Sequence, residues 1–124
     1  METRAAGETR VTNRTRGTQL AARAGRARSF RARLLGLMGR RTLPPGAGLL
    51  FPGTPWVHTC FMRLPIDAVF YGRGGVVLGV AHGLAPWRVS PYCRGGRGVV
   101  ELPAGTARRT QTVAGDVLDF DPPV

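Results

Sequence analysis

Residues 66–84, with the sequence IDAVFYGRGGVVLGVAHGL, decide the fold class of this chain. Residues 66–71 are rich in β-branched and aromatic side chains, and residues 76–84 form a second apolar run. Between them, residues 72–75 (GRGG) supply the glycines that a tight turn requires. Two such runs joined by a short turn are typical of a β-hairpin, so we predict antiparallel strands over 66–71 and 76–84.

Short apolar runs bounded by turn residues also occupy most of the remaining chain. A weak strand that starts at Val11 and a returning strand over 18–24, joined by a turn at 15–17, predict an N-terminal hairpin. Further strands are predicted over 48–51, 56–62, 98–102 and 117–120. Short strands at this spacing favour a mainly β fold, a single-domain antiparallel β-sandwich or barrel with one short α-helix. We expect a flexible N-terminal tail over 1–9 and a single β-rich domain over 10–124.

One segment breaks the strand pattern and predicts the helix. Apolar residues recur with helical spacing at Ala27, Phe30, Leu34, Leu37 and Met38. Gly39 is a typical helix stop, and the prolines at 44 and 45 prevent continuation. We therefore predict about three helical turns over 27–38.

Positive charge is concentrated near the N-terminus. All 18 basic residues are arginines and the net charge is +11, of which residues 1–41 carry +9 (11 arginines, 2 acids). Such an excess raises the possibility of a nucleic-acid partner. The exclusive use of arginine, with abundant alanine and glycine, indicates a compositional bias instead. No nucleic-acid-binding motif accompanies it, and the aromatic residues are not interleaved with the arginine-rich segment. Nucleic-acid binding through the arginine-rich N-terminal third therefore stays an alternative that we do not favour.

The chain shows no targeting or membrane signal. Residues 1–19 contain no apolar core of a secretory signal, and no apolar run approaches the length of a membrane span. We expect a cytoplasmic protein in which Cys60 and Cys93 are reduced thiols. Whether either thiol is reactive is left open.

Soft metal ligands alternate along the predicted strand 56–62. His58, Cys60 and Met62 would share one face of that strand, and His82 and Cys93 could complete a site. Their spacing matches no closed zinc motif, and Cys and Met are ordinary core residues. We therefore predict no metal and no cofactor. A Cys60–His58 nucleophile pair would need an adjacency that the sequence cannot show.

Two acidic residues interrupt otherwise apolar runs. Asp67 follows Ile66, and Glu101 lies between Val100 and Leu102. Strand alternation could direct both carboxylates to solvent. In runs that are apolar on both faces, however, a carboxylate must be paired, hydrogen-bonded or protonated. Arg33, Arg63 or His58 could act as the partner, so both structural and functional roles stay open.

Several sequence blocks, in this order, resemble the prokaryotic domain of unknown function 192, also called the UPF-0127 or uncharacterised ACR family. The resemblance spans residues 11–120 and is carried by 33–40 (RLLGLMGR), 48–51 (GLLF), 57–67 (VHTCFMRLPID), 86–89 (PWRV), 100–106 (VELPAGT) and 115–116 (GD). It implies a bacterial or archaeal protein with one compact, mostly β domain and a short helix. It implies no activity, because the family has no settled biochemical role.

The family blocks fall on Arg33, Gly36, Met38, Phe51, Met62, Pro65, Asp67, Glu101, Gly105 and Asp116. Gly105 fits a turn that needs a positive φ, and Gly115-Asp116 fits a turn before the last strand. Arg33, Asp67 and Glu101 are therefore the matched charged residues that no turn or packing role explains.

The leading hypothesis is a small non-enzymatic accessory module that binds a small molecule or a protein. A few polar groups in an apolar concavity are what a ligand site requires. The expected cleft has walls of Phe61, Met62, Phe70 and Trp87 and polar groups Arg33, Asp67, Glu101 and His58. The first alternative is a small enzyme in which Asp67 and Glu101 form an acid–base pair. The ligand and the oligomeric state are left open.

Overall fold

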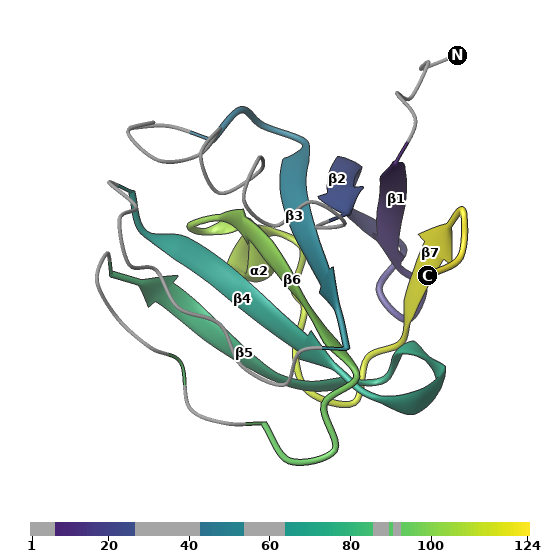
Figure 1. The fold of residues 1–124 in the computed structure, drawn as a ribbon. Coiled ribbons are helices and arrows are strands. Elements are labelled where there is room, and N and C mark those ends of the chain that lie inside the picture. The colour runs from purple at the N-terminus through teal and green to yellow at the C-terminus, as the bar shows by residue number, and fades with distance from the viewer. Residues whose placement is uncertain (1–6, 27–42, 54–63, 86–89, 91–92) are drawn as a thin grey trace.

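A computed structural model describes residues 7–26, 43–53, 64–85, 90 and 93–124. Most of these residues belong to one strongly curled β-sheet (Figure 1). Its strands are β1 (Glu8–Asn13), β2 (Thr18–Arg26), β3 (Ala47–Pro52), β4 (Ile66–Tyr71), β5 (Val77–Leu84), β6 (Gly98–Pro103) and β7 (Leu118–Asp121). Two short helical turns accompany them, η1 (Arg73–Gly75) and α2 (Thr106–Arg109).

The strand order is β5-β4-β6-β3-β2-β1-β7, which makes β5 and β7 the two edges. Neighbouring strands are antiparallel except for β2 and β3, which are parallel. The edges meet at one end of the sheet, where Val76 and Val117 form an isolated antiparallel bridge. Next to it, the amide of Val77 donates to the carbonyl oxygen of Asp116 at 2.7 Å, and that of Gly115 donates to the carbonyl oxygen of Val77 at 2.8 Å. The sheet is therefore a half-barrel that closes at this end.

The mainly β fold class is confirmed, and its form is a curled sheet of the barrel type. Both predicted hairpins are present, since β1 pairs with β2 and β4 with β5 in antiparallel register. The first strand begins at Glu8, inside the segment 1–9 that was predicted to be a tail. Thr9 is fully buried there and its hydroxyl accepts a hydrogen bond from Arg26 Nε at 3.0 Å, which fixes the strand's first residues.

Two predicted elements, the helix over 27–38 and the strand over 56–62, lie outside the described residues. The helix that is described, α2, was not predicted, because four residues are too few to show helical periodicity. The residue before it, Gly105, has a φ of 92°, as the predicted turn requires. Ala107 packs into the core, so tertiary contacts hold this short helix.

The main core lies inside the curl. Leu50, Val69 and Val100, from three neighbouring strands, have no exposed surface and pack with residues of β1, β2 and β7. Each fully buried aliphatic side chain of this kind contributes about 1.5–3 kcal/mol to folding. The packed interior therefore explains why the inward-facing residues of β4 and β6 are apolar.

The outer face of the same strands carries a second, smaller apolar cluster. It consists of Ala68, Phe70 and Val99, with Phe51, Ala81, Leu84 and Cys93 packed against them. Because successive strand residues alternate in direction, Ala68 and Phe70 face opposite to Val69. The central strands are thus buried on both faces of the sheet. The side chains of Asp67 and Glu101 must each project from one of these two buried faces.

Candidate functional site

Asp67 lies on the inner face and is fully buried. Three backbone amides donate to its carboxylate, that of Gly83 to Oδ1 at 2.8 Å and those of Gly105 and Ala107 to Oδ2 at 3.0 and 2.9 Å. These bonds connect β4 to the end of β5 and to the first turn of α2. Charge-assisted hydrogen bonds of this kind satisfy a buried carboxylate without an ion pair. Asp67 therefore has a structural role.

An open cleft of about 520 Å³ lies above Asp67. Its exposed polar side chains are His82, Arg108 and Arg109. The carboxylate of Asp67 forms part of the lining, yet the residue has no exposed surface and its oxygens are occupied by the three amides. A ligand in this cleft would therefore meet the basic side chains and not the acid.

Glu101 lies on the outer face and is 3% exposed. It is directly opposite Leu49 on β3 and Ala68 on β4, both apolar. Within the described part of the chain, no hydrogen bond or ion pair reaches its carboxyl group. Burial in these surroundings raises the pKa of Glu101 to about 8, because the charged form loses its hydration. At neutral pH the group is thus mostly an uncharged carboxylic acid.

The register separates the two acids and corrects the proposed acid–base pair. Asp67 is opposite Leu102, whereas Glu101 is opposite Ala68. Opposed residues share a face and consecutive residues do not, so the two carboxyl groups project from opposite sides of one sheet. They cannot share a proton or flank one substrate. The alternation rule was available in the sequence, but the pairing of β4 with β6 was not.

Of the predicted site residues, Phe70 and Glu101 share the outer face. Phe70 belongs to the cluster with Ala68 and Val99, and Val99 is two residues before Glu101 on the same face of β6. Apart from Asp67, which is on the inner face, the other predicted site residues lie outside the described part of the chain, namely Arg33, His58, Phe61, Met62 and Trp87, and so does Cys60. Where described, the chain contains no cluster of three or more His, Cys, Asp or Glu side chains suited to a metal ion.

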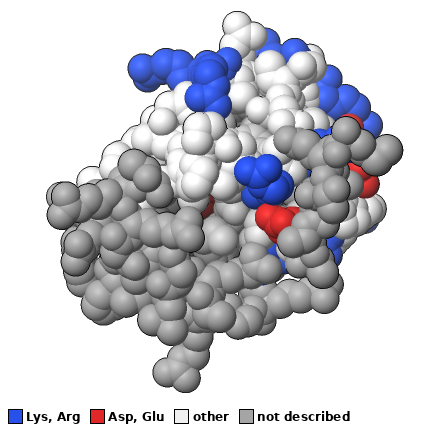
Figure 2. All heavy atoms as spheres, turned by 90° about the horizontal axis from the view of Figure 1, so that it is seen from above, with Lys and Arg blue, Asp and Glu red and all other residues white. Residues whose placement is uncertain are grey.

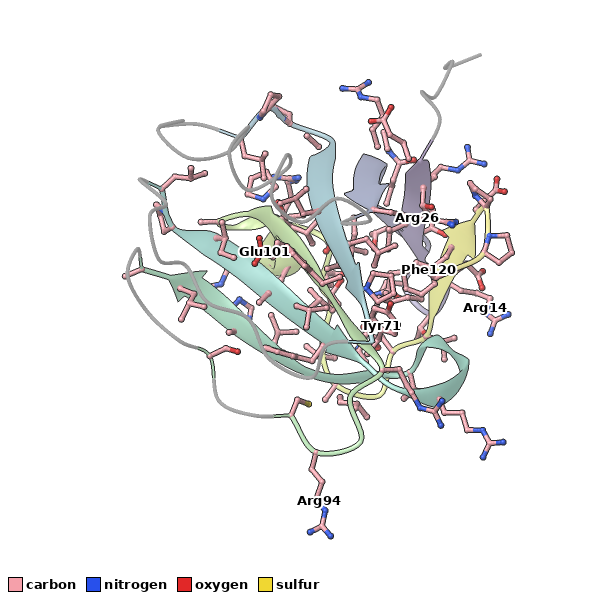
Figure 3. All side chains as sticks on the ribbon, viewed as in Figure 1. Arg14, Arg26, Tyr71, Arg94, Glu101 and Phe120 are labelled. Atoms are coloured by element: carbon pink, nitrogen blue, oxygen red, sulfur yellow. The ribbon has the colours of Figure 1, made fainter. Side chains whose placement is uncertain are left out.

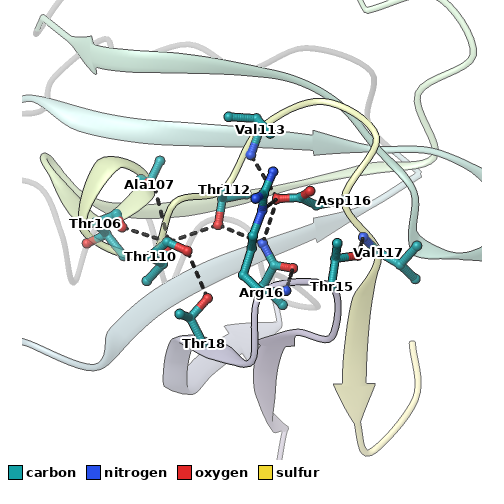
Figure 4. Close-up of polar contacts among 11 residues, drawn as sticks. Thr15, Arg16, Thr18, Thr106, Ala107, Thr110, Thr112, Val113, Asp116 and Val117 are labelled. Atoms are coloured by element: carbon teal, nitrogen blue, oxygen red, sulfur yellow. Dashed lines mark hydrogen bonds and ion pairs between the residues drawn. The ribbon is translucent and has the colours of Figure 1, made fainter.

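Sequence reasoning assigned Asp116 to a turn and missed a polar network around it (Figure 4). Asp116 Oδ2 accepts hydrogen bonds from Asn13 Nδ2 at 3.0 Å, Arg16 Nε at 3.2 Å and the amide of Val113 at 3.1 Å. Burial alone would raise the pKa of Asp116, but these three donors outweigh it and hold the pKa below its ordinary value. The network fastens the β1–β2 turn to the segment before β7.

Hydroxyl groups extend this network toward α2. Thr112 Oγ1 accepts from Asn13 Nδ2 at 3.1 Å and lies 2.8 Å from Thr110 Oγ1. The carbonyl oxygen of Thr110 accepts from Thr18 Oγ1 at 2.9 Å (Figure 4). Asn13, Thr110, Thr112 and Asp116 are all buried, so these contacts are part of the fold and not of a ligand site.

The arginines of the first hairpin are largely engaged by aspartates near the C-terminus. Arg10 pairs with Asp121 at 2.9 Å, Arg14 with Asp119 at 3.7 Å and Arg16 with Asp116 at 3.2 Å. Figure 2 shows an arginine group beside acidic atoms near the middle of that face, and further arginines in separate groups toward its edge. The positive charges of these three arginines are therefore offset by neighbouring aspartates, which weakens the case for a continuous basic surface.

The fold and these residues define a small curled β-sheet domain with an uncharged acid in its outer face. A family model described as uncharacterized ACR, domain of unknown function 192, matches residues 11–120, and the chain belongs to this family. No curated protein matches the chain significantly. None of the described helices is long and apolar enough to cross a membrane.

Two solved structures share the fold. A protein of unknown function from Novosphingobium aromaticivorans DSM 12444 is 24% identical, with a TM-score of 0.72, over 90% of this chain and 83% of that one. A candidate transcription regulator from Sinorhizobium meliloti 1021 is 26% identical, with a TM-score of 0.75, over 98% of both chains. These similarities confirm the fold and assign no activity.

Proposed function

We propose that this domain is a non-enzymatic module that binds a small molecule on the outer sheet face around Glu101. The observation that carries the proposal is a carboxyl group that is 3% exposed and hydrogen-bonded to none of the described residues. Burial without a cationic or hydrogen-bonding partner among the described residues disfavours the charged form of this acid, so the group stays a protonated donor. A protein that retains such a group at a buried position commonly uses it, and a bound ligand would supply the missing partner.

The chemistry of the face suggests the class of ligand. With its pKa raised to about 8, Glu101 is a hydrogen-bond donor at neutral pH and prefers a carbonyl or amide oxygen. Phe51, which is half-buried and packs on the cluster around the buried Phe70, would contact an apolar body. The ligand is thus an uncharged molecule with an apolar body and one amide-like head group.

The remaining predicted residues belong to this proposal as well. Phe61, Met62 and Trp87 stay predictions as apolar members of the site, and Arg33 and His58 as polar members, since all five lie outside the described residues. Asp67 is no longer included, because its oxygens are used by three backbone amides. Among the described residues of the outer face, no second carboxyl group accompanies Glu101, which is why we propose binding and not catalysis.

The experiment is a titration with hexanamide, followed by amide NMR shifts between about pH 6 and pH 9. Glu101→Gln replaces the acid by an isosteric, uncharged group, and Glu101→Leu removes hydrogen bonding. We expect wild-type affinity to fall above about pH 8, affinity of Glu101→Gln to be independent of pH, and binding to be lost in Glu101→Leu. The matched control is Asp119→Asn, which neutralises an exposed acid. Hexanamide-induced shifts that are the same in wild type and in both Glu101 variants would refute the proposal.

Nucleic-acid binding is the second candidate, and one comparison favours it, since the Sinorhizobium meliloti relative is described as a candidate transcription regulator. The ion pairs of Arg10, Arg14 and Arg16 count against it here, because paired arginines release fewer counterions on binding phosphates. A salt-dependent DNA titration distinguishes the two candidates.

A further inference from the structure

A second cleft, of about 570 Å³, lies between η1 and β7. It is at the end of the sheet where the edges meet. Tyr71, one of its lining residues, is opposite Gly98, three residues from Glu101 along β6, and packs in the inner core, whereas Glu101 lies on the outer face (Figure 3). Its lining includes Tyr71, Arg73, Gly75, Arg97, Asp119 and Phe120. The volume is within the range of small-molecule sites. All of these residues are described, and none belongs to the site around Glu101.

An aromatic pair forms one wall of this cleft. The rings of Tyr71 and Phe120 are 4.8 Å apart between centroids and inclined at 49°. Tyr71 is 6% exposed, and its hydroxyl group forms no hydrogen bond within the described part of the chain. The hydroxyl lies against Gly98, where an added Cβ would overlap it. Phe120 is only partly buried, so its ring can still accept a planar partner.

Two arginines provide positive charge at the same cleft. Arg73 and Arg97 are exposed, and their guanidinium groups form no ion pair with any described acid, in contrast to Arg10, Arg14 and Arg16. The backbone of Arg97 is held in place, because its amide donates to the carbonyl oxygen of Tyr71 at 2.8 Å and its carbonyl oxygen accepts from the amide of Gly53 at 2.6 Å. The backbone from which the Arg97 side chain projects is therefore fixed.

The single acidic side chain among the described lining residues is Asp119, and Arg14 lies 3.7 Å from it. The side chains around the cleft are thus net positive. A planar guanidinium matches the oxygens of a phosphate or carboxylate in two parallel hydrogen bonds. An aromatic wall beside two unpaired arginines selects for a ligand that combines a ring with an anionic group.

We propose that this cleft binds a small anion that carries a planar ring, the chemistry of a nucleoside monophosphate. Arg73 and Arg97 hold the phosphate, the base packs against Phe120, and the Tyr71 hydroxyl gains a hydrogen-bond partner. The site is separate from the one around Glu101 and takes a ligand of opposite character. Its success or failure therefore leaves the proposal for the outer face untouched.

The test is titration of the full chain with adenosine monophosphate, phenyl phosphate and inorganic phosphate, followed by calorimetry and amide NMR. We expect the two ring-bearing phosphates to bind at least about tenfold more tightly than inorganic phosphate, because only they use the aromatic wall. Amide shifts should centre on residues 72–75, 97 and 118–120. Equal affinity for all three probes, no binding, or shifts centred on Glu101 would overturn the proposal.

Variants separate this site from general positive charge. We expect Arg73→Ala combined with Arg97→Ala to weaken adenosine monophosphate binding about tenfold or more, and Tyr71→Phe to weaken it several-fold without disturbing the ring. The matched control is Arg94→Ala, because Arg94 extends into solvent away from the cleft (Figure 3). A loss of affinity in Arg94→Ala as large as in the double variant would refute the assigned site.

Discussion

Asp67 and Glu101 lie on adjacent antiparallel strands but project from opposite faces of the same sheet, because Asp67 is opposite Leu102 and Glu101 is opposite Ala68. The two acids also differ in their partners. Asp67 accepts three backbone hydrogen bonds, whereas Glu101 is bonded to no described residue. A buried carboxylate with three donors stabilises a fold, whereas desolvation of an acid without such donors disfavours its charged form. Substitutions at the two positions should therefore change stability in opposite directions.

We expect Asp67→Asn to lower the free energy of unfolding by about 2–4 kcal/mol. An asparagine keeps one acceptor oxygen, but in either orientation its NH₂ group faces at least one backbone amide that is itself a donor, that of Gly83 or those of Gly105 and Ala107. Urea unfolding monitored by circular dichroism measures the loss. Asp119→Asn, at an exposed position, is the control and should change stability by no more than about 0.5 kcal/mol. Equal stability of Asp67→Asn and wild type would contradict the structural role.

Glu101→Gln should raise the free energy of unfolding at pH 7 by about 1–3 kcal/mol. The pKa of Glu101 is raised from 4.5 to about 8 in the folded chain, so folding takes up a proton between these values. The favourable contribution of the protonated acid is complete below about pH 4.5 and is lost as the pH rises through about 8.

Unfolding measured at several pH values between about 5 and 9 should show this slope in wild type and its absence in Glu101→Gln. A wild-type profile in which stability increases over this interval would contradict the raised pKa. The Asp119→Asn control should keep the slope, because it alters an exposed group.

Asp116→Asn should destabilise the fold by about 2–4 kcal/mol at pH 7, with the opposite dependence on pH. The pKa of Asp116 is lowered from 3.8 in the folded chain, despite burial, by Asn13, Val113 and Arg16. The stabilisation is therefore present above about pH 3.8 and lost as the pH falls through the lower folded pKa. Acid unfolding curves of wild type and variant should converge at the acidic end. Parallel curves with a constant offset would contradict the lowered pKa.

Two leucines, one in the main core and one on the exposed edge of the sheet, allow a matched comparison. Leu50 has no exposed surface, whereas Leu78 is 38% exposed on the edge strand β5. We expect Leu50→Ala to cost about 2–5 kcal/mol, because it leaves a cavity, and Leu78→Ala to cost less than about 1 kcal/mol. Thermal and urea unfolding of both variants measures the difference. Similar losses for the two would indicate that the inner face is not the principal core.

Local patterns predicted the β-hairpins because each depends on a short run and an adjacent turn. The pairing of β4 with β6 and of β1 with β7 depends on strands far apart in the sequence, which one sequence cannot show. This is why burial of Asp67 and Glu101 could be predicted only as one alternative, and their separation could not be predicted. It is also why the contact between Tyr71 of β4 and Phe120 of β7 had no sequence signal. The short helix α2 depends on Asp67 from β4 and escaped prediction for the same reason.

Charge provides the last prediction, because the net charge of +11 would by itself indicate nucleic-acid binding. Since Arg10, Arg14 and Arg16 are paired with aspartates, we expect a labelled DNA duplex to bind only in the non-specific range, with a Kd of about 10⁻⁴ M or weaker at about 150 mM salt. Fluorescence anisotropy at several salt concentrations measures this. A Kd below about 1 μM with a steep salt dependence that is lost in the Arg10→Ala, Arg14→Ala double variant would establish the arginine-rich hairpin as a nucleic-acid interface. Asp119→Asn and Asp121→Asn release Arg14 and Arg10 from their partners, and both should strengthen DNA binding if unpaired arginine charge is the limiting factor.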